Sequence, residues 1–436
     1  RQHTESLLAS VLNEYESELV EDGRTPLEEE ARARLEAALK AHLFGAGNLD
    51  QLLDDPEVED ITINNYQTGF VKYADGSKVQ LPQVASSDKE LEEIVKTISA
   101  HDGLSTRPFD ILNYSVTLRL PDGSRLHAVQ GVSATGLSIS IRKHRHKRAT
   151  LMPVPGLAAR EEAAGVPVSL RTKDLYSEGT VDAALAAFLS ALIRARKNIM
   201  IAGAVGAGKT TMLRALASEI DPGERLITVE RSIELGLHED TARHPDMVAL
   251  EERLANVDDA GKVTLKDLVQ NSLRMTPDRV FVGEVLGDEV ITMLNAMMQG
   301  NDGSLSTIHA NSARDVISKI QTYALQAEER LPFDATNGLI DGALDFIVFM
   351  RRIRTPEGRQ RRIVESVLEL AGRDQDGVKT TPLWVYDREL GRTVFTRKAI
   401  VCEDELLEVG WDPDGPTTTQ LPPPPPGAAS AERWQI

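Results

Sequence analysis

Residues 203–211 read Gly-Ala-Val-Gly-Ala-Gly-Lys-Thr-Thr. This stretch fits the phosphate-loop pattern, in which a glycine, four other residues and a second glycine precede lysine and a hydroxyl residue. An apolar run at 198–202 comes before it, bounded like a buried strand, and residues 212–220 follow with helical spacing. A strand, a glycine-rich loop and a helix in this order are the context that the pattern needs, so we expect a nucleotide site here. The alternative is an ordinary glycine-rich turn at a strand end.

The glycines and the residues after them predict how the loop would work. Gly203, Gly206 and Gly208 can adopt backbone angles that a Cβ would forbid, so the loop can turn its N–H groups toward phosphate at the start of the helix. Lys209 is expected to reach the β- and γ-phosphates of ATP, and Thr210 to hold Mg²⁺ through its hydroxyl. The expected nucleotide-binding residues are Gly203, Ala204, Val205, Gly206, Ala207, Gly208, Lys209, Thr210 and Thr211.

Three later apolar segments end in side chains that suit phosphate chemistry, and the carboxyl ends of parallel strands face the nucleotide crevice. Glu230 and Glu234 follow the second core strand and are expected to hold a water or to share the metal shell; the alternative is a pair of surface glutamates. Glu284 ends a Walker-B-like strand and is expected to hold Mg²⁺ or to polarise the attacking water. His309 ends the next segment, which favours a γ-phosphate sensor over a structural histidine. The predicted metal ligands are Thr210, Glu284 and Glu230.

Bulk composition narrows the classes of function. With 436 residues the chain is long for one core, so two domains with appendages are expected. Its net charge of −18 argues against general nucleic-acid binding. Cys402 is the one cysteine, which excludes an internal disulfide and a cysteine-based metal site. The longest apolar stretch without a charge, 183–193, has 11 residues and is too short to span a bilayer, so any membrane role is expected to be peripheral.

The pattern of elements predicts an α/β protein. Residues 1–48 read as an N-terminal helical segment and 49–150 as a mixed α/β domain. Residues 151–170 read as a linker, and 171–402 alternate helices with short apolar strands, which implies a mostly parallel sheet covered on both faces. Residues 403–436 lose periodicity and contain five consecutive prolines, so a disordered or extended tail is expected. The predicted strands are 58–64, 70–73, 114–120, 125–130, 137–142, 198–202, 226–230, 279–283, 304–308 and 345–350, and residues 88–100 are a predicted helix.

Four motifs together resemble the secretion ATPase superfamily of type II secretion, type IV pili and type IV secretion. They are the Walker A loop at 203–210, the acidic box at 230–234, Val-Gly-Glu at 282–284 and Ser-Leu-Ser-Thr-Ile-His-Ala-Asn at 304–311. Within this superfamily the chain looks most like the Flp/Tad-type pilus assembly ATPases. That likeness rests on Leu-Pro-Asp-Gly-Ser-Arg at 120–125, Ile-Arg-Lys at 141–143, and the stretch from Leu-Arg-Met at 273–275 to Pro-Asp-Arg at 277–279. The resemblance covers roughly residues 50–370.

The resemblance implies a ring-shaped homohexamer at the cytoplasmic, inner face of the plasma membrane, working with integral inner-membrane platform proteins. Each subunit would join a PAS-like α/β domain to a RecA-like P-loop ATPase domain, with nucleotide between them. Arginines of the first domain would approach the phosphates and stabilise transition-state charge. Arg107, Arg119 and Arg125 lie at or near the family's arginine positions, and Arg125 is the first choice.

Some positions depart from the family. The family usually has arginine where Thr276 and Leu286 stand, and histidine where Asn301 stands. Three functions stay open: an ATP-hydrolysing motor for pilus assembly or protein secretion, a conjugation or DNA-translocation ATPase with the same core, and a nucleotide-gated scaffold with little turnover, which the departures favour. In the family the acidic-box and Walker B glutamates divide the base and metal roles, and the sequence leaves their assignment open.

Overall fold

A computed structural model describes most of the chain. It covers residues 15, 32, 49, 52–53, 55, 57–73, 77–101, 109–120, 123–143, 148–166, 171–253, 261–354, 360–375 and 377–415. Of the predicted N-terminal helical segment only single residues are described, and Arg107 lies outside the described residues. Contacts divide the chain into two compact units, Arg1–Arg145 and His146–Ile436.

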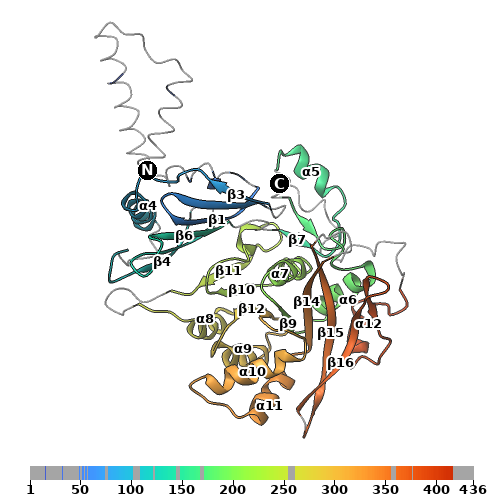
Figure 1. The fold of residues 1–436 in the computed structure, drawn as a ribbon. Helices are drawn as coiled ribbons and strands as arrows, with labels where there is room; N and C mark the ends of the chain where they lie inside the picture. Colours follow the sequence, from blue (N-terminus) through green and yellow to red (C-terminus); the bar gives the residue numbers. More distant parts are fainter. Residues whose placement is uncertain are drawn as a thin grey trace. The chain divides into compact units, whose positions relative to one another are not determined.

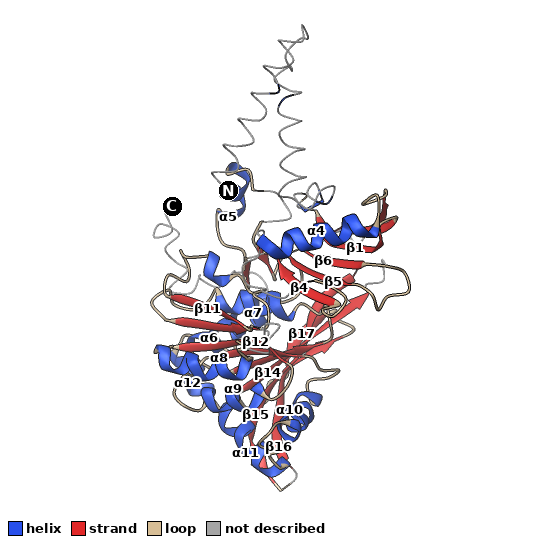
Figure 2. Ribbon diagram, turned by 90° about the vertical axis from the view of Figure 1, so that its left-hand side faces the viewer, coloured by secondary structure: helices blue, strands red, loops and turns tan. Residues whose placement is uncertain are grey.

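The first unit contains one antiparallel sheet in the order β3-β2-β1-β6-β5-β4. Alternating residues such as Ile61 and Ile63 on β1 are fully buried, and they pack with Leu91 and Val95 of helix α4, which lies along one face of the sheet (Figure 2). The alternation predicted five of these strands and the helix, whereas β3 was missed. The bounds are β1 Val58–Asn65, β2 Thr68–Tyr73, β3 Lys78–Leu81, α4 Asp88–His101, β4 Ser115–Arg119, β5 Arg125–Val129 and β6 Ser138–Arg142.

The second unit is built on a nine-stranded sheet in the order β11-β10-β12-β13-β9-β14-β15-β16-β17. The strands from β11 to β14 run parallel, and β15 to β17 extend the sheet antiparallel, with β14, β15 and β16 side by side as long strands (Figure 1). This arrangement confirms the α/β class and the mostly parallel sheet. The bounds are β9 Ile199–Gly203, β10 Leu226–Glu230, β11 Met247–Glu251, β12 Arg279–Val285, β13 Leu305–Ile308, β14 Phe346–Arg354, β15 Gln360–Asp374, β16 Gly377–Asp387 and β17 Arg392–Phe395.

Helices cover both faces of this sheet because the central strands are apolar on both sides. Along β9, Ile199 and Ile201 enter the core shared with α6 and α7, while Met200 and Ala202 enter the core shared with α8 to α11. No helix in the described ranges is both long enough and apolar enough to cross a bilayer. The helix bounds are α6 Ala183–Arg194, α7 Lys209–Ala217, α8 Leu265–Ser272, α9 Glu289–Met297, α10 Asp315–Gln326 and α11 Phe333–Ala343.

The segment predicted as a linker has structure of its own. Strand β7, Ala149–Thr150, pairs in parallel with β8, Lys173–Asp174, inside the second unit, and helix α5 spans Leu157–Ala163. Leu151 and Leu175 are buried in the core of that unit. The chain therefore enters the second unit a few residues before position 150, where the sequence placed the end of the first domain.

The predicted start of the tail at residue 403 is wrong. Residues Glu403–Glu408 form helix α12, whose Leu406 is fully buried. Trp411 then packs edge-to-face on Phe188 of α6, with ring centroids 5.3 Å apart. Burial of these two apolar side chains anchors residues 403–415 to the second unit. The proline run lies outside the described residues.

Candidate nucleotide-binding site

The glycine-rich loop has the backbone that a phosphate cradle needs. Gly203, Gly206 and Gly208 have φ values of 153°, 74° and 98°, which L-residues rarely adopt. A Cβ at Gly203 would collide with the carbonyl of Met350 on the neighbouring strand. Within the described part of the chain, the backbone N–H groups of Val205, Gly206 and Gly208 donate no hydrogen bond. Donors without partners beside the start of α7 fit an anionic ligand.

Lys209 is held inside this loop. Its side chain is 7 % exposed, and Nζ donates to the carbonyls of Gly203 (3.2 Å) and Ala204 (3.4 Å). Nζ also lies 3.0 Å from Nδ1 of His309. Burial lowers the pKa of Lys209, and Glu284 acts in the opposite direction. A partly desolvated ammonium held only by neutral acceptors is prepared to bind phosphate oxygens.

His309 joins Lys209 to Glu284. Its Nε2 lies 2.6 Å from Oε1 of Glu284. Because an ammonium can only donate, Nδ1 of His309 accepts from Lys209, and Nε2 therefore carries the proton that it donates to Glu284. Burial, followed by the charge of Lys209, lowers the pKa of His309, which favours this neutral imidazole.

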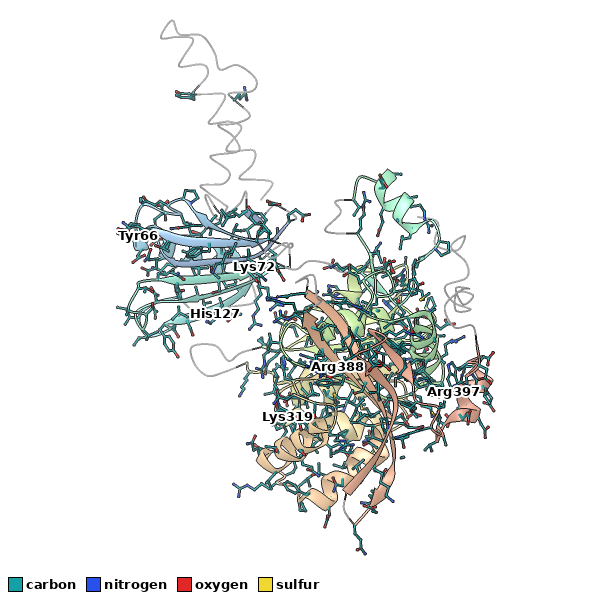
Figure 3. All side chains as sticks on the ribbon, turned by 45° about the vertical axis from the view of Figure 1, so that its right-hand side comes forward. Tyr66, Lys72, His127, Lys319, Arg388 and Arg397 are labelled. Carbon is teal, nitrogen blue, oxygen red and sulfur yellow. The ribbon has the colours of Figure 1, made fainter. Side chains whose placement is uncertain are left out.

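The order of the strands explains why these three side chains meet. Strand β9 leads into the loop, β13 is its neighbour and delivers His309, and β12 is next and delivers Glu284. Lys319 on α10, labelled in Figure 3, also acts to lower the pKa values of Lys209 and His309. Its ammonium is therefore a nearby charge that the motifs did not predict.

Glu230 takes a different position from the one predicted. Its carboxylate is buried, and Oε2 accepts from the backbone N–H groups of Glu234 (2.8 Å) and Leu235 (2.9 Å). A Cβ at Gly283 would lie 2.8 Å from Cγ of Glu230, so this close packing needs glycine at 283. Burial raises the pKa of Glu230 to about 7. Oε2 of Glu230 is therefore used in the turn that presents Glu234, whereas its buried Oε1 has no hydrogen-bond partner among the described residues. A role for Glu230 in holding the metal stays a prediction.

The turn itself leaves Glu234 exposed at the strand ends. Arg214 of α7 is buried beneath it and donates to the backbone carbonyls of Glu234 and Leu235. Glu234 also acts on Lys209 by its charge, raising its pKa against the effect of burial. Glu234 therefore remains a candidate for holding a water or sharing the metal shell, although it makes no hydrogen bond to the chain of Lys209, His309 and Glu284 in the described residues.

The possible Mg²⁺ ligands near the loop suit an ion that binds together with the nucleotide rather than to the protein alone. Thr210 is half-buried in the first turn of α7. Across the ranges that the structure describes, no group of three or more His, Cys, Asp or Glu side chains could hold a metal ion alone. Mg²⁺ commonly keeps several waters and combines one or two protein oxygens with substrate phosphates. Thr210 and Glu284 can supply those protein oxygens.

The predicted arginines belong to the first unit. Arg119 on β4 pairs in register with Arg125 on β5, and the side chain of Arg119 is not described. Arg125 is exposed and lines a depression of about 340 Å³ on the outer face of the sheet. Four other basic residues line the depression, Lys72, Lys78, His127 and Arg142, and Lys72 and His127 are labelled in Figure 3.

The three residues that depart from the family pattern make local contacts. Thr276 adopts φ 52° at the end of a 3₁₀ turn, Leu273–Met275, and its hydroxyl donates to the carbonyl of Met275. The side chain of Asn301 donates to the carbonyl of Pro277 (2.7 Å). The N–H of Leu286 donates to Glu289. None of these contacts reaches Lys209, His309 or Glu284.

Two arginines lie beside the loop that no motif in the sequence predicted. Nε of Arg362 donates to the carbonyl of Gly206 (3.2 Å). Nη1 of Arg352 would lie 3.6 Å from a Cβ at Gly206. The available signal was the arginine-rich stretch directly after the predicted strand at 345–350.

The solved structures that match this chain include three secretion or pilus ATPases. The VirB11 ATPase of the Brucella suis type IV secretion system, in complex with sulphate, is 24 % identical with a TM-score of 0.37, covering 77 % of this chain and 96 % of that one. The Legionella pneumophila ATPase DotB is 18 % identical with a TM-score of 0.46, covering 74 % and 79 %. The pilus retraction motor PilT with bound ADP is 15 % identical with a TM-score of 0.45, covering 83 % and 87 %.

Sequence comparison is more specific. A putative conjugal transfer protein of Mycobacterium tuberculosis is 32 % identical over 364 residues, which are 80 % of this chain and 91 % of the relative. Protein VirB11 of Agrobacterium fabrum is 33 % identical over 271 residues, 59 % of this chain and 73 % of the relative. The family described as Type II/IV secretion system protein matches residues 114–383. The chain therefore belongs to the type II/IV secretion ATPase family.

Proposed function

We propose that this protein is an ATP-hydrolysing motor that powers Flp/Tad-type pilus assembly or protein secretion at the cytoplasmic face of a membrane. The observation that carries the proposal is the continuous chain from Lys209 through His309 to Glu284 beside the glycine-rich loop. It joins a phosphate-binding cation to a carboxylate that can handle a proton. If these three side chains had only a structural role, there would be no reason for the neighbouring loop to hold backbone N–H groups without hydrogen-bond partners.

ATP binding would use the loop and the start of α7. The N–H groups of Val205, Gly206 and Gly208 would donate to phosphate oxygens, and Lys209 would exchange the neutral Nδ1 of His309 for an anionic acceptor. Thr210 would hold Mg²⁺, which neutralises charge on the phosphates, and Glu284 would reach the ion through one of its bound waters.

Hydrolysis would use Glu284. Its carboxylate accepts a proton from a water whose oxygen attacks the γ-phosphorus, while the bond between that phosphorus and the bridging oxygen of ADP breaks. His309 holds Glu284 by the hydrogen bond from Nε2, so it acts as a positioning residue and couples the occupancy of Lys209 to the orientation of Glu284. We assign the base role to Glu284 rather than Glu234, because Glu284 is part of the hydrogen-bonded chain.

The ring and its partners extend the proposal. We expect a homohexamer in which arginines of the first unit, Arg125 before Arg119 and Arg107, approach the phosphates. We also expect contacts with integral inner-membrane platform proteins. An arginine that reaches the phosphates only in one arrangement of the units would make hydrolysis depend on domain movement.

The test is an ATPase assay on purified protein with Mg²⁺ and with EDTA, alongside particle mass with and without a non-hydrolysable ATP analogue. The proposal expects Mg²⁺-dependent phosphate release that rises as hexamers form. Hexamers that release no phosphate in the presence of Mg²⁺ would support the nucleotide-gated scaffold instead, and single-turnover kinetics would settle that case.

A second candidate is a conjugation or DNA-translocation ATPase. The relative from Mycobacterium tuberculosis whose name refers to conjugal transfer favours it. The net charge of −18 opposes direct DNA contact. Binding of single- or double-stranded DNA that weakens steeply with salt would favour this candidate over the secretion motor.

A further inference from the structure

The hairpin formed by β14 and β15 places positive charge beside the glycine-rich loop. The chain carries a net charge of −18, yet five described residues of this hairpin between positions 351 and 362 are arginines. They are Arg351, Arg352, Arg354, Arg361 and Arg362. Neither the phosphate-loop motif nor the strand-end motifs include any of them.

Strand register sorts these arginines onto two faces of the hairpin. Met350 pairs with Gly203 at the end of β9, so β14 continues beyond the start of the loop. Arg352 lies directly opposite Arg362, which puts both side chains on one face. The adjacent positions Arg351 and Arg361 belong to the other face, because successive side chains along a strand alternate.

The face with Arg352 and Arg362 is the one that meets the loop. Arg362 donates from Nε to the carbonyl of Gly206 at 3.2 Å, and a Cβ at Gly208 would lie 2.9 Å from its Cδ. Nη1 of Arg352 lies 3.6 Å from the position of a Cβ at Gly206. Both guanidinium groups are therefore close to the backbone that would surround phosphate.

The arginines on the two faces of the hairpin differ in their partners. Arg351 forms an ion pair with Glu365, and Arg361 donates from Nε and Nη2 to the carbonyl of Gly179 (2.9 and 2.6 Å). In the described ranges, Arg352 and Arg362 form no ion pair. Like charges directly opposite each other on antiparallel strands are destabilising. An anion between the two guanidinium groups would remove this repulsion, and phosphate matches the planar donor geometry of arginine.

We infer that Arg352 and Arg362 form a clamp for the α- and β-phosphates of the nucleotide in the loop. The inference rests on the proposed ATP site and adds two phosphate ligands to it from an element outside the motifs. Loop N–H groups cradle the α- and β-phosphates, while the lysine reaches the β- and γ-phosphates. Since the arginines contact the loop at Gly206 and Gly208, they act on ADP as well as ATP.

The test compares the full-length variants Arg352→Gln and Arg362→Gln with Arg351→Gln, which removes the same charge from the other face. Dissociation constants for Mg²⁺–ATP and Mg²⁺–ADP are measured by calorimetry. Loss of one charged hydrogen-bond donor predicts binding about ten- to one-hundred-fold weaker for both nucleotides in the two clamp variants. Arg351→Gln should stay close to wild type.

A second readout separates a ligand role from a structural one. Without nucleotide, Arg352→Gln should be at least as stable to heat as wild type, because it removes a like-charge repulsion. The rise in melting temperature on adding ADP should be smaller in this variant than in wild type. If Arg352 had only a structural role, Arg352→Gln would melt at a lower temperature without nucleotide, and ADP would raise its melting temperature as much as that of wild type.

Three outcomes overturn the clamp. The clamp is excluded if both clamp variants bind nucleotide as tightly as Arg351→Gln does. If Lys209→Ala loses nucleotide binding in the same experiment, the proposed function survives. Loss of salt-sensitive DNA binding with unchanged nucleotide affinity would assign the arginines to nucleic acid. Failure of wild type to bind either nucleotide would overturn the clamp and the proposed function together.

Discussion

At the scale of residues, the proposed chemistry depends on three side chains that are distant in sequence. Lys209, His309 and Glu284 form one hydrogen-bonded chain because β9, β13 and β12 are neighbours in the sheet. The sequence predicted each of them from its motif. It did not predict their contacts, because the order of strands in a sheet is set by packing between distant segments.

Other residues show the limit of reading motifs alone. Glu230 stands at a strand end, as a metal ligand would, and its Oε2 also accepts from the N–H groups of Glu234 and Leu235, which its place in the motif did not reveal. Arg352 and Arg362 come close to the loop only because the hairpin folds beside β9. A spacing pattern cannot identify a side chain that another element brings in.

Turnover should depend more on Glu284 than on Glu234. Glu284→Gln keeps the shape of the side chain but can no longer accept a proton from water, so ATP binding should persist while kcat falls at least about a hundredfold. Glu234→Gln removes an equal charge from an exposed position and should cost less. Steady-state kcat and the dissociation constant for ATP are measured for both variants. A larger loss of kcat in Glu234→Gln than in Glu284→Gln would assign the role of the base to Glu234 instead.

At the scale of elements, the predicted strands agree with the structure wherever an apolar run is short and bounded. Residues 226–230 were predicted as a strand and form β10 with those bounds, Leu226–Glu230. The sequence pattern predicted no strand beyond residue 350, although β15 spans Gln360–Asp374. The first part of β15 is rich in arginine, so its β character comes from pairing with β14 rather than from hydrophobic pattern.

Helix α12 should contribute measurably to stability. Leu406 is fully buried, whereas its neighbour Leu407 is 47 % exposed. Leu406→Ala should lower the free energy of unfolding by about 3 kcal/mol, because it removes buried apolar surface and leaves a cavity. Leu407→Ala, the matched control, should change it by about 0.5 kcal/mol or less. Urea unfolding of both variants is the measurement, and equal effects would show that α12 is not anchored through Leu406.

At the scale of the whole molecule, buried ionisable groups link stability to pH. His244 is 6 % exposed, and burial lowers its pKa to about 4. In the unfolded chain a histidine binds a proton below a pKa of about 6.5. Between these values the unfolded state holds a proton that the native state lacks, so stability is complete above the unfolded pKa and is lost as the pH falls.

The size of this effect can be isolated with His244→Gln. The free energy of unfolding of wild type relative to the variant should be constant above about pH 7 and fall by up to about 3 kcal/mol toward pH 4. The raised pKa of Glu230 changes the free energy of unfolding in the opposite direction over part of this pH range. Because Glu230 is present in both proteins, its contribution cancels in the difference between them. Urea unfolding at several pH values checks the prediction. Parallel pH profiles for the two proteins would contradict it.

The two units should also cooperate in turnover. If Arg125 of the first unit reaches the phosphates within the ring, Arg125→Ala should lower kcat about a hundredfold or more and leave ATP affinity nearly unchanged. Lys72→Ala removes a cation from the same depression and serves as the control. Measuring kcat with particle mass separates loss of chemistry from loss of the hexamer. An unchanged kcat in intact hexamers would exclude Arg125.

The most direct measurement is ATP affinity and turnover in Lys209→Ala. Lys266→Ala is the control, because Lys266 pairs with Glu329 in a salt bridge away from the loop. A lysine that grips the triphosphate requires the first variant to lose at least about tenfold in affinity, together with nearly all phosphate release, while the control behaves as wild type. Wild-type binding and phosphate release in Lys209→Ala would contradict the account.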